Sequence, residues 1–421
     1  MSKTTPPKIP MSSPHLAASD RRRMHAALRQ AGLPEGDLKS VLKVLEGANL
    51  SMGPQNEAFE QIFRDYTGAK HAVSVNSGTA GLHLCVRAAG IASGDLVLTT
   101  PFSFVSSTNV ILFEKATPVF VDVDPHTGNL DVNLLAEAAR DLAAGGSKAR
   151  KWLPRRGVGP GASRRQVLKA ILAVDIFGQP AEMDAICKIA DEFGLKVIED
   201  SCEALGSEYK GQKAGRLGDY GVYAFYPNKQ ITTGEGGVIV TDDDQAADLM
   251  RALRNQGRAP GDTWLRHTYL GYNYRLDEMS AALGVTQMQR IEELLAKREQ
   301  VARWYNERLS EISGLELYTV EPNTTRMSWF VYVVKFAKDI DRDILAQALT
   351  ERGIPVRPYF SPIHLQPYMV ERFGYQPGDF PATEDLGGRG LAIPFSSVMT
   401  EAMVEEVCQE IRQALQKYPR K

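Results

Sequence analysis

The run A-I-L-A-V-D-I at residues 170–176, together with K-V-I-E-D at 196–200, decides which fold the sequence predicts. Both runs are short and largely apolar, as expected for strands that are covered on both faces. Helical segments separate such runs along the chain, and this alternation predicts an α/β fold with a mainly parallel, seven-stranded sheet. The other five predicted strands are at 72–75, 96–100, 118–123, 221–225 and 238–241.

Outside this sheet, hydrophobic periodicity predicts helices ahead of the first strand and a mixed pattern near the end of the chain. A long helical stretch at 278–303 is expected to bridge the two parts. The remaining predicted elements are helices at 19–30, 35–45, 341–352 and 400–415 and a strand at 329–336.

The length of 421 residues is enough for two packed cores and too great for one typical domain. We expect a large domain over residues 19–290 and a smaller α+β domain over 291–421. Residues 1–18 are expected to form a disordered leader, because residues 1–14 are rich in Lys, Pro, Ser and Thr and contain no apolar signal core.

Composition and charge argue against several classes of function. The 49 Lys and Arg residues nearly balance the 51 Asp and Glu residues, which gives no reason to expect nucleic acid or an acidic membrane surface as a partner. No apolar run reaches the ~18 to 20 residues that a membrane span needs. The four cysteines are widely spaced without a C-x-x-C pair, so we expect a cytoplasmic protein with no disulfide scaffold and no metal site.

The segment G-G-S-K-A-R-K-W-L-P-R-R-G-V-G-P-G-A-S-R-R (145–165) contains seven basic residues and no acidic ones. Its many Gly and Pro residues predict a surface loop, inserted before the strand at 170–176. Two interpretations stay open for this loop. It is either simply solvated, or it is a patch that steers an anionic substrate.

The first cluster of candidate site residues is V-N-S-G-T-A (75–80), which follows a predicted strand and opens a helix. Unpaired N–H groups and the positive end of the dipole make a helix start an anion site. Gly78 lets the backbone approach a ligand closely, and Ser77 and Thr79 add hydroxyl donors. The alternative is an ordinary helix cap, since Ser and Thr are favoured there.

The second cluster is V-I-E-D-S (197–201), an apolar strand that ends in Glu199 and Asp200. In open α/β sheets, ligands bind beyond the carboxyl ends of the strands, where a carboxylate can pair with a protonated pyridine nitrogen. Successive side chains of a strand point to opposite faces, so only one of the two acids can face such a site. A plain turn after the strand would also explain an Asp here.

The third cluster is A-F-Y-P-N-K-Q-I-T-T-G-E-G-G (224–237). Pro227 ends the preceding strand and G-E-G-G forces a sharp turn, so Lys229 is held between them. A lysine is usually just solvated. Here it joins an acidic strand end and a Ser/Thr-Gly helix start, and the three together supply the imine-forming amine, the ring-nitrogen partner and the phosphate cradle that a pyridoxal 5′-phosphate (PLP) site needs.

In combination these motifs closely resemble the DegT/StrS family of PLP-dependent sugar aminotransferases. The resemblance covers about residues 47–415 and implies PLP-dependent transferase fold type I (aspartate aminotransferase-like), with a large domain and a smaller C-terminal one. The motifs that carry it are N-L-S-M-G-P (49–54), V-N-S-G-T-A (75–80), P-F-S-F-V (101–105), F-G-Q-P-A-E-M-D (177–184), I-E-D-S-C-E-A-L-G (198–206), F-Y-P-N-K-Q (225–230), G-E-G-G (234–237) and G-Y-N-Y-R (271–275).

The resemblance implies roles for the matching residues. Lys229 matches the catalytic lysine that forms an imine with PLP and then moves a proton, and Asp200 matches the partner of the pyridine nitrogen. Phe104 lies where the family places a ring stacked on the pyridine, although core packing would also explain it. The expected cofactor-binding residues are Ser77, Gly78, Thr79, Phe104, Asp200, Glu203, Lys229 and Asn273.

Three further residues are matched to the partner subunit or the substrate. Asn273 matches an asparagine that the family donates to the neighbouring subunit's cofactor phosphate, which implies a homodimer with shared active sites. Arg275 either assists it or forms a structural ion pair. His364, in P-I-H-L-Q-P-Y (362–368), either approaches the substrate sugar or is a packed histidine.

The sequence departs from the family pattern at several positions. Ala224 stands where a serine often bonds the phosphate, so that contact is absent or replaced, with Tyr226 as one candidate. Glu203 stands where many members have Gln or His beside the cofactor ring. Asp175 stands where His is common, and the basic insertion 145–165 is not typical of the family.

The resemblance implies an aminotransferase that converts a nucleotide-linked keto-sugar to an amino-sugar, with glutamate as amino donor and PLP as cofactor. A PLP sugar dehydratase is disfavoured, because the family's dehydratases have histidine at the position of Lys229. A glutamine-dependent cyclitol (inosose) aminotransferase shares these motifs and is the alternative enzyme. A non-catalytic PLP-binding regulatory protein is the alternative from another class.

Overall fold

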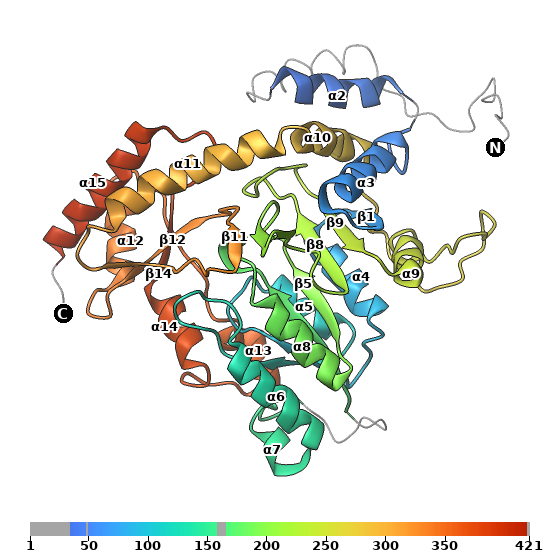
Figure 1. Ribbon diagram of the computed structural model, residues 1–421, viewed down its shortest axis with the longest axis horizontal. Helices are drawn as coiled ribbons and strands as arrows, with labels where there is room; N and C mark the ends of the chain where they lie inside the picture. Colours follow the sequence, from blue (N-terminus) through green and yellow to red (C-terminus); the bar gives the residue numbers. More distant parts are fainter. Residues whose placement is uncertain (1–33, 48, 158–165, 419–421) are drawn as a thin grey trace.

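The computed structural model describes residues 34–47, 49–157 and 166–418. At its centre lies the expected sheet of seven strands, which are β1 (His71–Val75), β2 (Leu96–Thr99), β3 (Thr117–Phe120), β4 (Leu168–Val174), β5 (Lys196–Asp200), β8 (Tyr220–Ala224) and β9 (Gly237–Thr241). Their order in the sheet is β1-β9-β8-β5-β4-β2-β3, and Figure 1 labels β1, β9, β8 and β5 of this sheet. Strand β9 is antiparallel to both neighbours and the other pairs are parallel, so the predicted, mainly parallel α/β fold is confirmed.

Side chains from the large sheet pack into apolar layers on both of its faces, because successive side chains of a strand point to opposite faces. On β2, Val97 enters one layer and Leu98 the other. Helices on both faces explain why the strands read as continuous apolar runs. The Val97 layer is covered by α4 (Gly78–Ala88), α5 (Ser106–Phe113) and α9 (Asp244–Arg254), and the opposite side by α3 (Pro54–Thr67), α6 (Val132–Ala144), α8 (Met183–Phe193) and α10 (Glu278–Met288).

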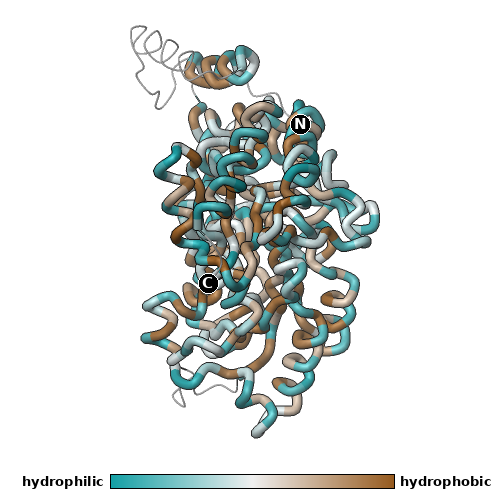
Figure 2. Tube along the Cα trace, turned by 90° about the vertical axis from the view of Figure 1, so that its left-hand side faces the viewer, coloured by the Kyte–Doolittle hydropathy of each residue, from teal (hydrophilic) through white to brown (hydrophobic). Residues whose placement is uncertain are grey.

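Helix α2 (Glu35–Glu46) is the first element that the structure describes, and it packs on α10. Leu38 and Leu45 are buried, and the Asp37 carboxylate accepts a hydrogen bond from Gln287 Nε2 at 2.7 Å. Figure 2 shows hydrophobic and hydrophilic residues alternating along the chain, as amphipathic elements require. The predicted leader and the helix predicted at 19–30 lie outside the described residues.

The C-terminal part of the chain forms a second, antiparallel sheet in the order β10-β12-β14-β13. The strands of this sheet are β10 (Leu315–Leu317), β12 (Tyr332–Phe336), β13 (Arg357–Pro358) and β14 (Gly390–Ile393), and its helices are α11 (Ile291–Leu309), α12 (Arg342–Glu351) and α15 (Glu401–Lys417).

The smaller elements are β6 (Glu208–Tyr209), β7 (Gln212–Lys213), β11 (Thr324–Arg326), α7 (Gly146–Arg150), α13 (Pro367–Phe373), α14 (Pro381–Arg389) and the 3-10 turns Ile176–Gly178 and Ile363–Leu365. None of the described helices is both long enough and apolar enough to cross a membrane.

The two sheets are joined by more than one segment. Helix α11 passes from one core to the other, since Ile291 and Leu295 pack beside α3 and β9 whereas Tyr305 and Leu309 pack on the second sheet. Phe360 follows β13 and returns to the core of the large sheet. The domain boundary at residue 291 stays a prediction, and α11 contributes to the packing on both sides of it.

The single helix predicted at 278–303 is wrong, because the chain forms α10 and α11 with a break between them. Arg290 leaves the helical conformation, with φ −114° and ψ 15°. No Gly or Pro marks this break in the sequence. It lets Met288 and Ile291 both enter the core beside α3, so tertiary packing decides it.

Two other predicted elements differ in extent. The segment 145–165 was expected to be a loop throughout, but α7 forms within it after Gly145 and Gly146 adopt φ values of 72° and 66°. The strand predicted at 329–336 begins only at Tyr332. Trp329 has a φ of 44°, which lies outside the extended region, so this residue cannot belong to the strand.

The carboxylate of Glu278 holds the start of α3 in place. It accepts hydrogen bonds from the backbone N–H groups of Gly53, Gln55 and Asn56 at 2.8, 2.8 and 3.0 Å. We expect Glu278→Gln to lower the free energy of unfolding by about 2 to 4 kcal/mol, because an amide brings donors against N–H groups that need an acceptor. Chemical denaturation measures the change. Glu293→Gln, exposed on α11, is the control, and equal losses in both variants would contradict this account.

Candidate active site

A cavity of about 480 Å³ opens at the edge of the large sheet where the parallel strands end. Parallel strands bring their carboxyl ends together, so residues that are distant in sequence meet at this edge. Of the residues predicted for the site, those that line the cavity are Ser77, Gly78, Thr79, Phe104, Asp200, Glu203, Tyr226 and Lys229. The structure does not bring Asn273, Arg275 or His364 to its walls.

Lys229 lies in the turn that follows β8. Pro227 follows the end of this strand, and the backbone N–H of Lys229 donates to the carbonyl of Tyr226 at 2.9 Å, which closes the turn. The Lys229 side chain is only 13% exposed. Its Nζ lies 3.9 Å from the ring centroid of Phe330 and 3.7 Å from Glu203 Oε1, so the amine sits between an aromatic ring and a carboxyl group.

The two acids at the end of β5 lie on opposite faces of the sheet. Asp200 lines the cavity, where its carboxylate accepts hydrogen bonds from the Ser107 hydroxyl at 2.6 Å and from the Cys202 backbone N–H at 3.2 Å. Glu199 is fully buried on the other face and accepts from the backbone N–H of Gly215 at 2.6 Å. Glu199 therefore holds the chain that leads into β8, and Asp200 is the acid available to a ligand.

The start of α4 forms another wall of the cavity. Ser77 caps the helix, since its Oγ accepts the backbone N–H of Ala80 at 3.1 Å, and its own hydroxyl proton is left to donate. A Cβ added to Gly78 would lie 2.7 Å from the Ala224 Cβ and 2.8 Å from the Cys202 Sγ, so a side chain does not fit there. The unpaired N–H groups of this helix start can receive an anion.

Two aromatic side chains remain open at the cavity. Phe104 is 61% exposed and Tyr226 is 54% exposed. Core packing, the alternative interpretation of Phe104, does not account for a ring that is mostly uncovered. Both rings are therefore placed to contact a ligand rather than the protein interior.

Glu203 stands beside Lys229 with an unusual charge state. Burial raises the pKa of the Glu203 carboxyl to about 7, and the nearby Lys229 ammonium limits the rise. Its Oε2 accepts the backbone N–H of Phe177 at 3.0 Å. The carboxyl therefore exchanges between a charged and a neutral form near neutral pH, and the neutral form resembles the glutamine that is common in the related family at this position.

Asn273 and Arg275 lie on the loop between α9 and α10, outside the cavity of their own chain. Asn273 forms an isolated antiparallel bridge with Asn255, and its carbonyl accepts from Asn76 Nδ2 at 3.4 Å, close to the start of α4. Arg275 donates to the Asn255 side chain at 3.0 Å. This amide, rather than a carboxylate, is the partner of Arg275 in the described part of the chain. The side chain of Asn273 is exposed.

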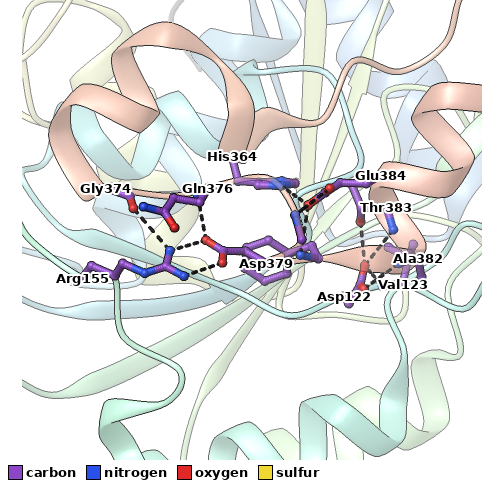
Figure 3. Close-up of polar contacts among 12 residues, drawn as sticks. Asp122, Val123, Arg155, His364, Gly374, Gln376, Asp379, Ala382, Thr383 and Glu384 are labelled. Carbon is purple, nitrogen blue, oxygen red and sulfur yellow. Dashed lines mark hydrogen bonds and ion pairs between the residues drawn. The ribbon is translucent and has the colours of Figure 1, made fainter.

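His364 does not approach the cavity, so its expected contact with the substrate is corrected. Its side chain is fully buried, with Nε2 2.9 Å from Glu384 Oε1 (Figure 3). The ring packs edge-on against Phe380, with centroids 4.7 Å apart. Burial lowers the pKa of His364, which favours the neutral imidazole. Of the two interpretations, a substrate contact or a packed histidine, the structure therefore supports the packed histidine.

The described part of the basic segment, residues 145–157, also lies away from the cavity and contributes none of its lining residues. Arg155 forms two hydrogen bonds with the Asp379 carboxylate (Figure 3), and Lys151 pairs with Glu137 and Asp141. All five basic residues of 145–157 are nevertheless exposed to solvent, as the solvated interpretation predicts. The ion pairs neutralise cations that were candidates for steering a substrate. Residues 158–165 lie outside the described part of the chain.

Several residues of the cavity are not among those that the sequence predicts for the site. Ser107, the donor to Asp200, lies two residues after the P-F-S-F-V motif (101–105), so its position near a matched motif was an available signal. Phe330 and Tyr359 come from the C-terminal part of the chain. No local pattern marks them, because the packing of the second sheet against the first brings them to the cavity.

The residues present fit the cofactor that the resemblance implies. Lys229 offers an amine, Asp200 a buried carboxylate, Gly78 an open helix start and Phe104 an exposed ring, all on one cavity. The cavity volume also falls within the roughly 300 to 1,000 Å³ of small-molecule sites. Each part of PLP (aldehyde, ring nitrogen, phosphate and aromatic face) has a chemically matched group.

The raised pKa of Glu203 predicts a pH-dependent stability. Between about pH 4.3, the unfolded pKa, and about pH 7, the folded pKa, Glu203 binds a proton more in the folded protein than in the unfolded chain. The stabilisation that this proton gives is present at low pH and is lost as the pH rises through 7. In cofactor-free protein, we expect the free energy of unfolding of Glu203→Gln, relative to that of wild type, to rise by roughly 2 to 3 kcal/mol from pH 5 to pH 8. Denaturation curves measure it. The exposed Glu192→Gln is the control, and a pH-independent difference for Glu203→Gln would contradict the raised pKa.

Known proteins are similar to this chain over most of its length. GDP-perosamine synthase of Caulobacter vibrioides is 36% identical over 359 residues, which cover 85% of this chain and 89% of that protein. EpsN of Bacillus subtilis, named as a pyridoxal phosphate-dependent aminotransferase, is 32% identical over 395 residues, 94% of this chain and 92% of that protein. The solved structure of Helicobacter pylori PseC, an aminotransferase involved in the biosynthesis of pseudoaminic acid, matches with a TM-score of 0.80 at 26% identity, over 92% of this chain and 98% of that one.

A family model, the DegT/DnrJ/EryC1/StrS aminotransferase family, matches residues 33–412. That span includes every residue that lines the cavity. The expected enzyme class and cofactor are confirmed by these relatives: the protein is an aminotransferase that depends on PLP. The chain belongs to the DegT/DnrJ/EryC1/StrS aminotransferase family.

Proposed function

We propose that this enzyme transfers an amino group from glutamate to a keto-sugar that is linked to a nucleotide. The observation that carries the proposal is the meeting of the Lys229 amine, the Asp200 carboxylate and the start of α4 in one cavity. These groups suit amino transfer, which needs a nucleophilic amine and a bound electron-withdrawing ring. The name of the related GDP-perosamine synthase supports a nucleotide-linked sugar as the substrate class.

Each wall of the cavity would hold a different part of the cofactor. The N–H groups at the start of α4 and the hydroxyls of Ser77 and Thr79 would bind the phosphate, and Asp200 would pair with the ring nitrogen. The Ser107 hydroxyl, which donates to Asp200 at 2.6 Å, fixes the orientation of that carboxylate. When it is bound, PLP withdraws electrons from the substrate carbon that loses a proton.

Lys229 would hold the cofactor at rest and move the proton during transfer. Its Nζ must be uncharged to accept a proton from the substrate carbon. The Glu203 carboxyl, whose pKa is raised to about 7 by burial, lies 3.7 Å from this amine and is placed to hold or release a proton beside it.

We also infer a homodimer in which the two active sites share residues. The exposed Asn273 lies outside the cavity of its own chain, so contact with a cofactor phosphate requires the site of a neighbouring subunit. The same loop exposes Trp264, Leu265 and Leu270 by 77%, 83% and 83%. Large apolar side chains gathered on one exposed loop support a surface that a partner covers.

The first test is the loss of the covalent link to PLP. We expect the purified wild type to be yellow with bound PLP and Lys229→Ala to lose the visible absorbance band of the lysine-bound cofactor, with activity reduced by at least about 1,000-fold. Absorbance spectroscopy and single-turnover kinetics measure both effects. The control is Lys297→Ala, an exposed lysine on α11 that pairs with Glu293.

Several outcomes would contradict the proposal. Wild type that binds no PLP at saturating cofactor would refute the role of the cavity. Wild type that binds PLP but is never aminated by L-glutamate would refute the donor. In a panel of nucleotide-linked keto-sugars and inososes tested against the aminated enzyme, reaction with inososes alone would favour the cyclitol aminotransferase instead.

The shared site predicts complementation between two inactive variants. A mixed dimer of Lys229→Ala and Asn273→Ala subunits contains one site with both native residues, so refolded equal mixtures should regain about a quarter of wild-type activity. Enzyme assays of the mixture and of each variant alone measure this. If Asn273 served the site of its own chain, the mixture would show no gain over the two variants.

A further inference from the structure

One buried arginine, Arg298 on α11, contacts the backbone of the lysine turn. It is 4% exposed, and burial alone accounts for the change in its pKa, with no carboxylate contributing among the described residues. Its guanidinium donates to backbone carbonyl groups instead. A buried charge without a counter-ion is costly, so its retention requires contacts that a neutral side chain would not provide.

The carbonyl groups belong to two segments that are distant in sequence. Nη2 of Arg298 donates to the carbonyl of Lys229 at 2.7 Å and to that of Asn228 at 3.4 Å. Nη1 donates to the carbonyl of Phe330 at 3.1 Å and to that of Trp329 at 3.3 Å. The Phe330 ring is the one that lies 3.9 Å from Lys229 Nζ. One guanidinium therefore links the backbone of the lysine to the backbone of the ring that contacts its amine.

The second segment has a strained backbone that needs support. Trp329 has a φ of 44°, in the left-handed region that non-glycine residues seldom adopt. A second link joins the same two segments, since Gln230 Nε2 donates to Ser328 Oγ at 2.7 Å. The turn at 228–230 and the segment 328–330 are thus fixed to each other at successive residues.

The guanidinium is suited to this position by its charge and its shape. Burial lowers the pKa of Arg298 to about 10, so the side chain remains charged at neutral pH and its hydrogen bonds are charge-assisted. Its planar fork serves two carbonyl groups on each side, which a lysine ammonium cannot do in the same geometry. The bonds end on main-chain atoms and leave the Lys229 amine free to move.

We propose that Arg298 is a positioning residue for amino transfer: it holds the Lys229 turn and Phe330 in register, so that Nζ stays at its place in the cavity. The proposal rests on the function proposed above for Lys229. A displacement of a reacting group by about 1 Å can lower a rate roughly 100-fold, so an anchor on the backbone of the lysine acts directly on the reaction.

The test compares the PLP-loaded forms of wild type, Arg298→Lys, Arg298→Met and the control Arg303→Lys. Arg303 is exposed on the same helix, where it donates to Gln300 at 2.7 Å. A pH titration gives the midpoint of the visible absorbance band of lysine-bound PLP. Stopped-flow absorbance gives the rate constant with which L-glutamate removes this band, normalised to bound PLP.

We expect Arg298→Lys to shift the titration midpoint and to lower the rate constant roughly 10- to 100-fold while it retains PLP and folds like wild type. Arg298→Met should lose more, and Arg303→Lys should match wild type in both measurements. An Arg298→Lys variant with an unchanged midpoint and a rate within twofold of wild type would overturn the inference. So would a loss of rate that only follows a loss of folded protein.

The same experiment separates this inference from the proposed function. Wild type without a visible band would refute the role of Lys229 and, with it, that of Arg298. A band in wild type, together with an unchanged midpoint and rate constant in Arg298→Lys, refutes only the positioning role. If L-glutamate fails to react with wild type, the proposed donor is wrong, and the titration midpoint alone decides the role of Arg298.

Discussion

The parallel register of β4, β5 and β8 is the constraint on which the active site depends. Val174 pairs with Asp200, and Asp200 with Val222, so the three strands end almost level with one another. The turn that carries Lys229 therefore starts close to the carboxylate expected to pair with the cofactor ring. A slip of one residue in β5 would exchange the two faces and turn Glu199 toward the cavity in place of Asp200.

The charges around the amine are governed by burial. Lys229, Glu203 and Arg298 are all largely withdrawn from water, and each is held by specific polar groups because an unpaired buried charge is costly. The consequences differ. Glu203 acquires a pKa near neutrality, whereas Arg298 stays charged and forms hydrogen bonds with the main chain. The sheet edge and α11 therefore both contact the lysine, since Glu203 lies beside its amine and Arg298 donates to its backbone carbonyl.

Local patterns predicted the seven strands and the three clusters that line the cavity, because each cluster directly follows a strand or opens a helix of the parallel sheet. They failed where distant residues decide the conformation. The break at Arg290 depends on packing beside α3, and the irregular start of β12 depends on Trp329. A substrate contact was one interpretation of His364, but the fold buries this side chain beside Glu384, which belongs to α14.

The sequence by itself determined the fold class, because strand periodicity and turn residues act over a few neighbouring positions. Its motifs determined the family and predicted Lys229 and Asp200 as the amine and the carboxylate of the site. Only the tertiary structure decided which side chains surround the amine. Phe330 and Arg298 reach Lys229 because the second sheet and α11 pack against the end of β8. Such contacts join residues far apart in the chain, so they depend on how whole elements pack and leave no local pattern in the sequence.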